Sequence, residues 1–113
     1  ADRVKIAHGH PEDPDHYTYP GEFSPELLGE ERVLVLGHTH VQHAEAFEAG
    51  VVCNPGSVGQ PRDGDPRAAY AVIDVDTASV SLHRVEYDID AVIDGIHDAG
   101  LPSQIGERLR TGR

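Results

Sequence analysis

Several residue types are scarce in this sequence, and each shortage narrows what the chain can be. It has no Trp or Met and only 5% aromatic residues, so its core must consist mainly of Val, Ile, Leu and Ala. The single cysteine, Cys53, excludes an internal disulfide framework and is typical of a reducing cytoplasm. No apolar run approaches the roughly 18 residues of a membrane helix, and no signal peptide is recognisable. We therefore expect a cytoplasmic protein without a membrane partner.

Positive charge is also scarce. Nine basic residues stand against 20 acidic ones, which gives a net charge of −11. This balance argues against general nucleic-acid binding, because no basic stripe is available to neutralise phosphates. The acidic residues are spread along the chain, as in halophilic proteins, whose self-repulsion is screened by salt. The 113 residues suit one domain with a modest core.

Hydrophobic patterns predict an α/β (α+β) fold with strands first and helices last. Apolar or alternating segments predict strands at residues 4–7, 32–37, 68–76 and 79–88, and a hairpin over residues 44–57. Residues 11–23 and 58–67 are rich in Pro, Asp and Gly and predict loops. Ser24 and Pro25 predict the start of a short helix over residues 24–31. A helical tail over residues 88–113 should contain two short helices, the first capped by Asp88.

Histidines gather in two clusters, His8-Gly9-His10 and His38-Thr39-His40, each directly after an apolar segment. Because alternate residues of a regular strand point the same way, His38 and His40 can converge, and Gly37 would let the backbone turn. Two neighbouring strand ends would bring both clusters into one pocket, where neutral imidazoles are good ligands for first-row metals. The alternative for a His-X-His pair is an ordinary hydrogen-bonded loop. For His16, His43, His83 and His97 we expect surface or packing roles.

A third feature is the segment Asn54 to Gly59, "NPGSVG", which follows the strand-like "VVC". Ser57 is not a nucleophile elbow, because the residue two positions before it is Pro55 and not glycine. Two interpretations remain open. Asn54, Gly56 and Ser57 form a tight turn that bonds its own backbone, or they pack under the histidines and orient them.

Three segments together, "AHGHP", "LVLGHTH" and "VVCNPGSVGQPRDGDPRAAYAVID", resemble the C-terminal half of a calcineurin-like metallophosphoesterase of the small prokaryotic phosphodiesterase and phosphatase branch. The resemblance implies half of a metallophosphoesterase-type β-sandwich flanked by helices, within a single domain. It also implies two divalent metal ions, with manganese favoured and iron, nickel, zinc or magnesium as alternatives. By the same resemblance, His8 and His38 bind the second metal ion and His40 binds the first. His10 has no fixed role in the family and could face substrate.

The resemblance also shows what is missing from these 113 residues. The family's Asp-X-His, its bridging Asp and its Asn-His pair, which carries the proton-donating His, do not occur here. We therefore expect this chain to need the N-terminal half of its domain, and to have little or no activity alone. The implied activity of the whole is hydrolysis of a small phosphomonoester or phosphodiester. The alternatives are an inactive scaffold of the same fold, or a free-standing metal-binding module whose edge strands are covered by a partner or by self-association.

Two arginines follow the "NPGS" segment and could grip a substrate phosphate. Arg62 and Arg67 both lie in "PRDGDPR", where each has an Asp nearby in sequence. Guanidinium groups bind phosphate well because they offer several donors in a fixed plane. The alternative, which we favour on sequence grounds, is that both arginines form ion pairs within a solvated loop.

Overall fold

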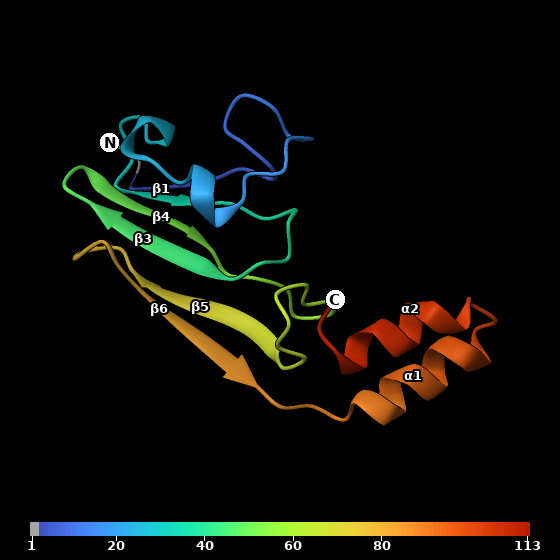
Figure 1. Ribbon diagram of the computed structural model, residues 1–113. Coiled ribbons are helices and arrows are strands. Elements are labelled where there is room, and N and C mark those ends of the chain that lie inside the picture. Colours follow the sequence, from blue (N-terminus) through green and yellow to red (C-terminus); the bar gives the residue numbers. More distant parts are fainter. Residues whose placement is uncertain (1–2) are drawn as a thin grey trace.

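The computed structural model describes residues 3–113, and its largest unit is a mixed four-stranded sheet. The strands β1 (Val4–Ile6), β2 (Val33–Val35), β3 (His43–Phe47) and β4 (Gly50–Asn54) lie in the order β1-β2-β4-β3. The first three in that order run parallel, whereas β3 runs antiparallel to β4. Figure 1 shows this sheet above a separate two-stranded hairpin.

The register of the parallel strands decides where the site forms. Val4 pairs with Val33, and Ile6 pairs with Val35, so β1 and β2 end at the same level. Parallel strands have their carboxyl ends at one edge of a sheet, where connecting loops bring functional groups together. The residues after Ile6 and after Val35 therefore emerge side by side, and each of these segments contains one histidine cluster.

The main core lies on one face of this sheet. Phe23, Leu34, Leu36 and Val52 form a buried cluster against which Ala7, Leu27, Leu28 and Phe47 pack. Leu34 and Val52 come from β2 and β4, whereas Phe23 comes from the segment that crosses over the sheet. All five residues of β4 are buried, as expected for a central strand covered on both faces. Cys53 is buried within it.

The second unit is the antiparallel hairpin of β5 (Ala68–Asp74) and β6 (Ser79–Val85), which contacts β3 and β4. Two long side chains connect it to the sheet. Nε2 of Gln42 donates to the carbonyl oxygens of Pro55, Tyr70 and His83 at 3.1–3.2 Å. Arg84 donates to Gln42 Oε1 at 2.9 Å and forms an ion pair with Asp63. These contacts fix the loop over residues 55–67 between the two sheets.

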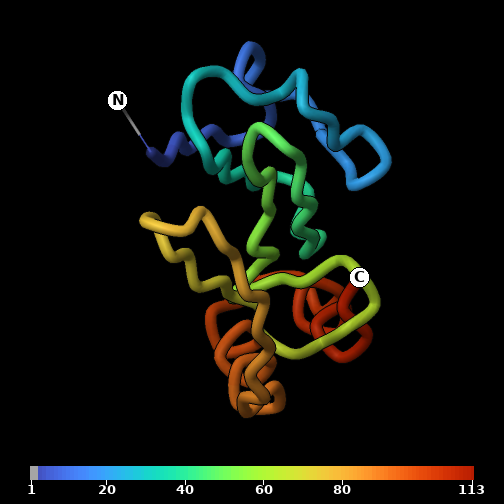
Figure 2. The backbone as a smooth tube through the Cα atoms, turned by 90° about the vertical axis from the view of Figure 1, so that its left-hand side faces the viewer, coloured from blue at the N-terminus to red at the C-terminus, as the bar shows by residue number. Residues whose placement is uncertain are grey.

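The chain ends in helices at the opposite end of the molecule from β1 (Figure 2). α1 (Ile89–Asp98) begins at Asp88, whose side chain accepts a hydrogen bond from Ala91 N, as predicted for an N-cap. α2 (Ser103–Glu107) continues into the 3-10 turn η3 (Arg108–Arg110). None of the helices in residues 3–113 is long and apolar enough to cross a membrane.

The predicted mixed fold, with strands first and helices last, is confirmed. The predicted helix over residues 24–31 is wrong. Residues Pro25–Leu27 form a single 3-10 turn, η2, and Ser24 makes no side-chain capping bond. A similar turn, η1 (Pro20–Glu22), interrupts the predicted loop before it. The turn ends at Leu28, which has extended angles, so the chain leaves the helical path there while Leu27 and Leu28 pack on the core.

Candidate functional site

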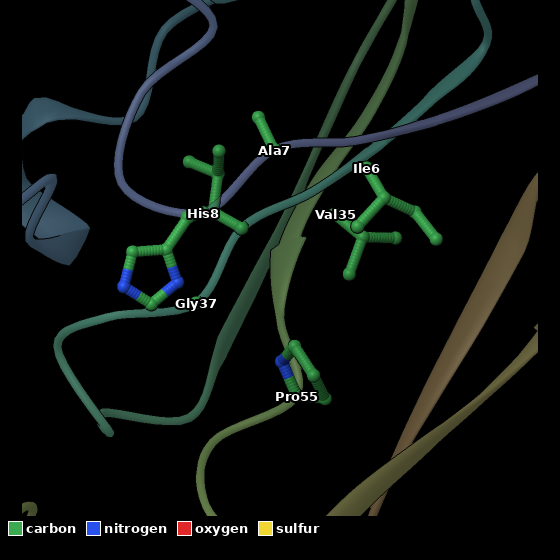
Figure 3. Close-up of a pocket in the computed structure, with 7 residues that line it drawn as sticks. Ile6, Ala7, His8, Val35, Gly37 and Pro55 are labelled. Atoms are coloured by element: carbon green, nitrogen blue, oxygen red, sulfur yellow. The ribbon is translucent and has the colours of Figure 1, made fainter. Parts of the chain in front are cut away.

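The ends of β1 and β2 bring His8 and His38 into direct contact. Nε2 of His8 lies 3.0 Å from Nδ1 of His38, and the ring centroids are 4.5 Å apart. Gly37 N also donates to His8 O at 2.7 Å, so the backbones of the two segments stay joined past the strands. One histidine of each cluster therefore meets the other, as the sequence predicts, whereas His10 and His40 do not join this pair. His8 also lines a largely apolar pocket of about 360 Å³ with Ile6, Val35 and Pro55 (Figure 3).

The turn that carries His38 and His40 differs from the predicted strand geometry. Both residues have positive φ angles, 71° for His38 and 60° for His40, whereas Gly37 does not. The left-handed region is unfavourable for residues other than glycine, and it is found in folded proteins mainly where the surroundings enforce it. The expectation that these two imidazoles point the same way from a regular strand is therefore wrong. The strand ends at Val35, and each histidine receives its own orientation.

The loop over residues 11–23 holds the His38 ring. Nε2 of His38 lies 3.1 Å from the carbonyl oxygen of Asp15, which can only accept, so Nε2 carries the proton. The ring of Tyr17 stacks on the imidazole with centroids 3.8 Å apart and planes 15° apart. Nδ1 of His38 is thereby left with its lone pair directed at His8. This is the neutral tautomer in which Nδ1 can bind a metal ion.

His40 is oriented independently, by the loop that follows β4. Its Nδ1 donates to the carbonyl oxygen of Gln60 at 2.8 Å, which leaves Nε2 as the free nitrogen. Burial lowers the pKa of His40 below its usual value, and the positive charge of Arg62 lowers it further. Both effects favour the neutral imidazole, which is the form that coordinates metal ions.

Asn54, the last residue of β4, connects this strand to the turn after β2. Its side chain is buried and donates to Gly37 O and to Thr39 Oγ1, each at 3.0 Å. Its Oδ1 accepts from Gly56 N at 2.9 Å. Both interpretations of this segment therefore hold, because Asn54 bonds its own turn and also supports the backbone on either side of His38. The amide nitrogen of Asn54 donates two hydrogen bonds and its oxygen accepts one, so the buried side chain is held in place and fixes the turn.

Gly56 and Ser57 have structural roles in the same segment. Gly56 has a φ of 84°, and a Cβ there would lie 2.8 Å from the Cβ of Ala69. Ser57 Oγ accepts from Gln60 N at 2.8 Å, and its carbonyl accepts from Ala69 N. These bonds position Gln60, whose carbonyl orients His40. Ser57 therefore acts as a turn residue, which agrees with the sequence-based conclusion that it is not part of a nucleophile elbow.

The two arginines behave differently, which corrects the expectation that both are paired with Asp. Arg67 forms a bidentate pair with Asp65, at 2.7 and 3.1 Å. Arg62 is exposed, and its guanidinium donates only to the neutral Oε1 of Gln60 within residues 3–113. Its backbone N donates to His40 O at 3.0 Å. Arg62 is therefore an uncompensated cation beside His40.

His10 lies apart from the pair formed by His8 and His38. Its ring meets His16 edge-on with centroids 5.5 Å apart, and both line a pocket of about 180 Å³ with Glu12 and Asp13. His16 Nε2 lies 3.0 Å from Glu22. His43 bonds Glu45 and packs on Phe23, away from the candidate site. His83 stacks on Tyr70 in the hairpin.

The arrangement fits metal binding in part. Two nitrogen ligands of a first-row ion, each at about 2.1 Å, lie roughly 3.0 Å apart when they subtend about 90° at the metal. The separation of His8 Nε2 and His38 Nδ1 has this value. However, no group of three His, Cys, Asp or Glu side chains in residues 3–113 is arranged to hold an ion. These residues offer a pair of ligands at one point and a single imidazole at another.

Comparison with known proteins identifies the family. The family model of the calcineurin-like phosphoesterase superfamily domain matches residues 1–78. The chain belongs to the calcineurin-like phosphoesterase superfamily. The resemblance that the histidine motifs indicate is thereby confirmed. Metallophosphoesterases depend on divalent metal ions.

Individual relatives cover the chain better than the chain covers them. An uncharacterized protein of Methanocaldococcus jannaschii, MJ0912, is 30% identical over 98% of this chain and 52% of its own length. The phosphodiesterase YfcE of Escherichia coli K12 is 37% identical over 69% of this chain and 38% of its own length. The chain therefore spans about half the length, or less, of the curated relatives it matches.

Solved structures agree with the fold. A metallophosphoesterase from Sphaerobacter thermophilus matches all of this chain with a TM-score of 0.84 and 32% identity, over 56% of its own chain. The hypothetical protein PH1004 from Pyrococcus horikoshii OT3 matches 97% of this chain with a TM-score of 0.81, over 46% of its own chain. Its identity is 24%, so this likeness shows the fold alone.

Three residues at the site escaped the sequence analysis. Asp15 and Gln60 orient histidines through main-chain carbonyls, and a carbonyl leaves no signature in the sequence. Tyr17 contacts His38 through its side chain. Its signal was available, because a chain with so few aromatic residues places two tyrosines in one polar loop, at positions 17 and 19.

Proposed function

We propose that this chain supplies three histidine ligands of a dinuclear metal site that hydrolyses phosphomonoesters or phosphodiesters. The observation that supports it best is which ring nitrogens the histidines leave for a metal ion. Nε2 of His8 and Nδ1 of His38 meet at 3.0 Å, whereas His40 has Nδ1 bonded to Gln60 O and only Nε2 left free. This division is what two separate ions would need.

The roles of the chain's own residues follow from these bonds. His8 and His38 hold one ion, and His40 holds the other. Asp15 and Gln60 keep His38 and His40 in the required tautomers. When bound, divalent ions of such a site supply a hydroxide nucleophile near neutral pH and polarise the phosphoryl oxygen. Manganese is the metal we favour. Iron, nickel and zinc also suit imidazole ligands, whereas magnesium would depend on oxygen ligands from elsewhere in the site.

Arg62 is the proposed substrate-binding residue. Its guanidinium is exposed and is held by Gln60 Oε1 at 2.7 and 3.2 Å, through Nη2 and Nε. The remaining N–H groups are available to a phosphate oxygen. A guanidinium in a chain with a net charge of −11 also attracts an anionic ester locally. Arg67 is unsuitable, since Asp65 already neutralises it.

We also propose that the remaining ligands come from another part of the same domain. Ile6 is 78% exposed beside His8, in the apolar pocket of Figure 3. β1 is a three-residue edge strand whose outer side is open within residues 3–113. An exposed large apolar residue on an open edge is unfavourable in water and indicates a missing neighbour. The complementary half of a phosphoesterase domain would cover this edge and complete the site.

The test compares the 113-residue chain with the product of the longest reading frame that encodes it. Hydrolysis of a bis-aryl phosphate is measured with added Mn²⁺, together with the metal content of each protein. We expect turnover and two metal ions in the longer protein, and little of either in the chain alone. His38→Ala in the longer protein should remove most of the turnover. His83→Ala, a change at a histidine outside the site, is the control.

Other outcomes decide between the alternatives. Significant turnover by the 113-residue chain alone would contradict the division of the site. A longer protein with one metal ion or none, and without turnover, would favour an inactive scaffold. A reading frame that encodes neither Asp-X-His nor Gly-Asn-His before the chain would contradict hydrolysis by a dinuclear site.

A further inference from the structure

We propose that Tyr17 and Tyr19 form an aromatic ledge that binds a flat ring carried by the phosphate ester, such as a nucleobase or a simple aryl group. This proposal rests on the proposed function and adds to it the chemical class of the leaving group. Three observations support it: the exposure of the two rings, their mutual orientation and their position next to His38.

The two rings are parallel and open to solvent. Their centroids are 6.2 Å apart and their planes differ by 17°. Tyr17 is 45% exposed and Tyr19 is 48% exposed. The chain has only six aromatic Phe and Tyr residues, so one third of them lie in this small area. Flat, half-exposed rings of this kind are the surfaces on which bases and aryl groups stack.

Thr18 explains why both tyrosines face outward. This residue is 2% exposed, and its hydroxyl donates to the carbonyl of Gly9 at 2.6 Å. In an extended segment, neighbouring side chains point to opposite sides and alternate ones to the same side. Tyr19 has extended angles, with φ −80° and ψ 161°. Burying Thr18 therefore turns Tyr17 and Tyr19 together toward solvent.

The backbone under the ledge is fixed before any ligand binds. The carboxylate of Glu22 accepts from Tyr19 N at 3.1 Å and contacts His16 Nε2 at 3.0 Å. A Cβ at Gly9 would lie 2.2 Å from the carbonyl oxygen of His16, so the loop rests directly on the turn after β1. A surface that is already ordered loses less entropy when it binds a ligand.

The position of the ledge connects it to the reaction. Tyr17 stacks on His38 at 3.8 Å, so the ledge begins at a proposed metal ligand. An ester whose phosphate lies at the histidines would have its organic group within reach of the tyrosines. Tyr19 extends this surface away from the metal site, and within residues 3–113 its ring stacks with that of Tyr17 alone.

The test measures binding without hydrolysis. Dissociation constants for adenosine monophosphate, phenyl phosphate and ribose phosphate are determined by NMR titration of the longest protein that contains the chain and of its Tyr19→Ala variant. Stacking on one aromatic side chain contributes about 1–3 kcal/mol, so we expect the two ring-bearing ligands to bind about tenfold more tightly than ribose phosphate. Tyr19→Ala should remove most of this preference. Tyr70→Ala, which removes an equally exposed tyrosine stacked on His83, should leave it unchanged.

The outcomes separate the ledge from the proposed hydrolysis. Tighter binding of adenosine monophosphate than of phenyl phosphate would assign a nucleobase, and equal binding of the two would assign a simple aryl group. Equal binding of all three ligands, or a preference that survives Tyr19→Ala, would overturn the ledge. A ring preference in a protein without turnover would leave the ledge standing and contradict only the hydrolysis. Turnover without a ring preference would contradict the ledge and leave the proposed hydrolysis standing.

Discussion

Nε2 of His8 and Nδ1 of His38 lie 3.0 Å apart although 30 residues separate them in the sequence. The relationship depends on two parallel strands that end at the same level, since Ile6 pairs with Val35. It also depends on the loop over residues 11–23, which fixes the His38 tautomer through Asp15 O. The site is therefore a property of the sheet edge and its covering loop together.

Removing the aromatic ring that covers His38 should weaken metal binding. In the longest protein that contains the chain, we expect Tyr17→Ala to lower the affinity of the His8 and His38 ion roughly tenfold, because groups that orient a ligand typically contribute this much. Tyr17→Phe should restore the affinity, since the stack needs the ring and not the hydroxyl. Isothermal titration with Mn²⁺ measures both. A loss as large in Tyr70→Ala would show that the effect is merely structural.

Asn54 should be important for both stability and the histidines. Asn54→Ala leaves Gly37 O, Thr39 Oγ1 and Gly56 N without their partner in a buried site. We expect a loss of about 2–3 kcal/mol in the free energy of unfolding, measured by urea denaturation. The ring signals of His38 should also shift in the folded variant. Unchanged stability would mean that water replaces the amide.

Arg62 and Arg67 offer a matched pair of substitutions. Arg62→Gln should raise the KM for a phosphate ester about tenfold with a smaller change in kcat, because a charge-assisted bond contributes about 1.5–3 kcal/mol. Arg67→Gln should have little effect on KM, since Asp65 neutralises that guanidinium. Steady-state kinetics of the longest protein tests both. An equal rise in KM for the two variants would refute a specific role for Arg62.

Burial raises the pKa of the Cys53 thiol to about 11. The unfolded chain should ionise near the usual value of about 8.5. The stability linked to Cys53 is therefore fully present below that value and is lost as pH rises toward the folded value. We expect a thiol reagent to react slowly with the native chain and rapidly in denaturant. Cys53→Ala should flatten the alkaline part of the stability profile, and fast labelling of the native protein would argue against the buried thiol.

Much of the fold could be predicted because local patterns and tertiary packing agree. The apolar run ending at Val35 is a central strand, and Asp88 caps α1 as its position indicates. The segment around Leu27 was mispredicted because its local signals favour a helix while its apolar residues must reach the core. Tertiary packing overrides a weak local preference in such short segments.

The contact between His8 and His38 was predictable, whereas the local geometry of the turns that carry the histidines was not. Two His-containing turns after apolar strands indicated that His8 and His38 would meet. The positive φ angles of His38 and His40 were not predictable, since Gly37 was the obvious residue to adopt them. Arg62 was assigned to an ion pair by its sequence neighbours, whereas the structure gives the local carboxylates to Arg67 and Arg84. The distance between two residues in the sequence does not decide which arginine pairs with a given aspartate.

A zinc titration of the longest protein that contains the chain, followed by NMR of the histidine ring signals, tests the division of the ligands between two ions. We expect His8 and His38 to respond together along one binding curve, while His40 responds along a different one. His83 and His97 serve as internal controls and should stay unchanged over the same range. If all three site histidines followed a single curve at one ion per chain, or if His8 and His38 responded separately, the proposed division of the ligands between two ions would be contradicted.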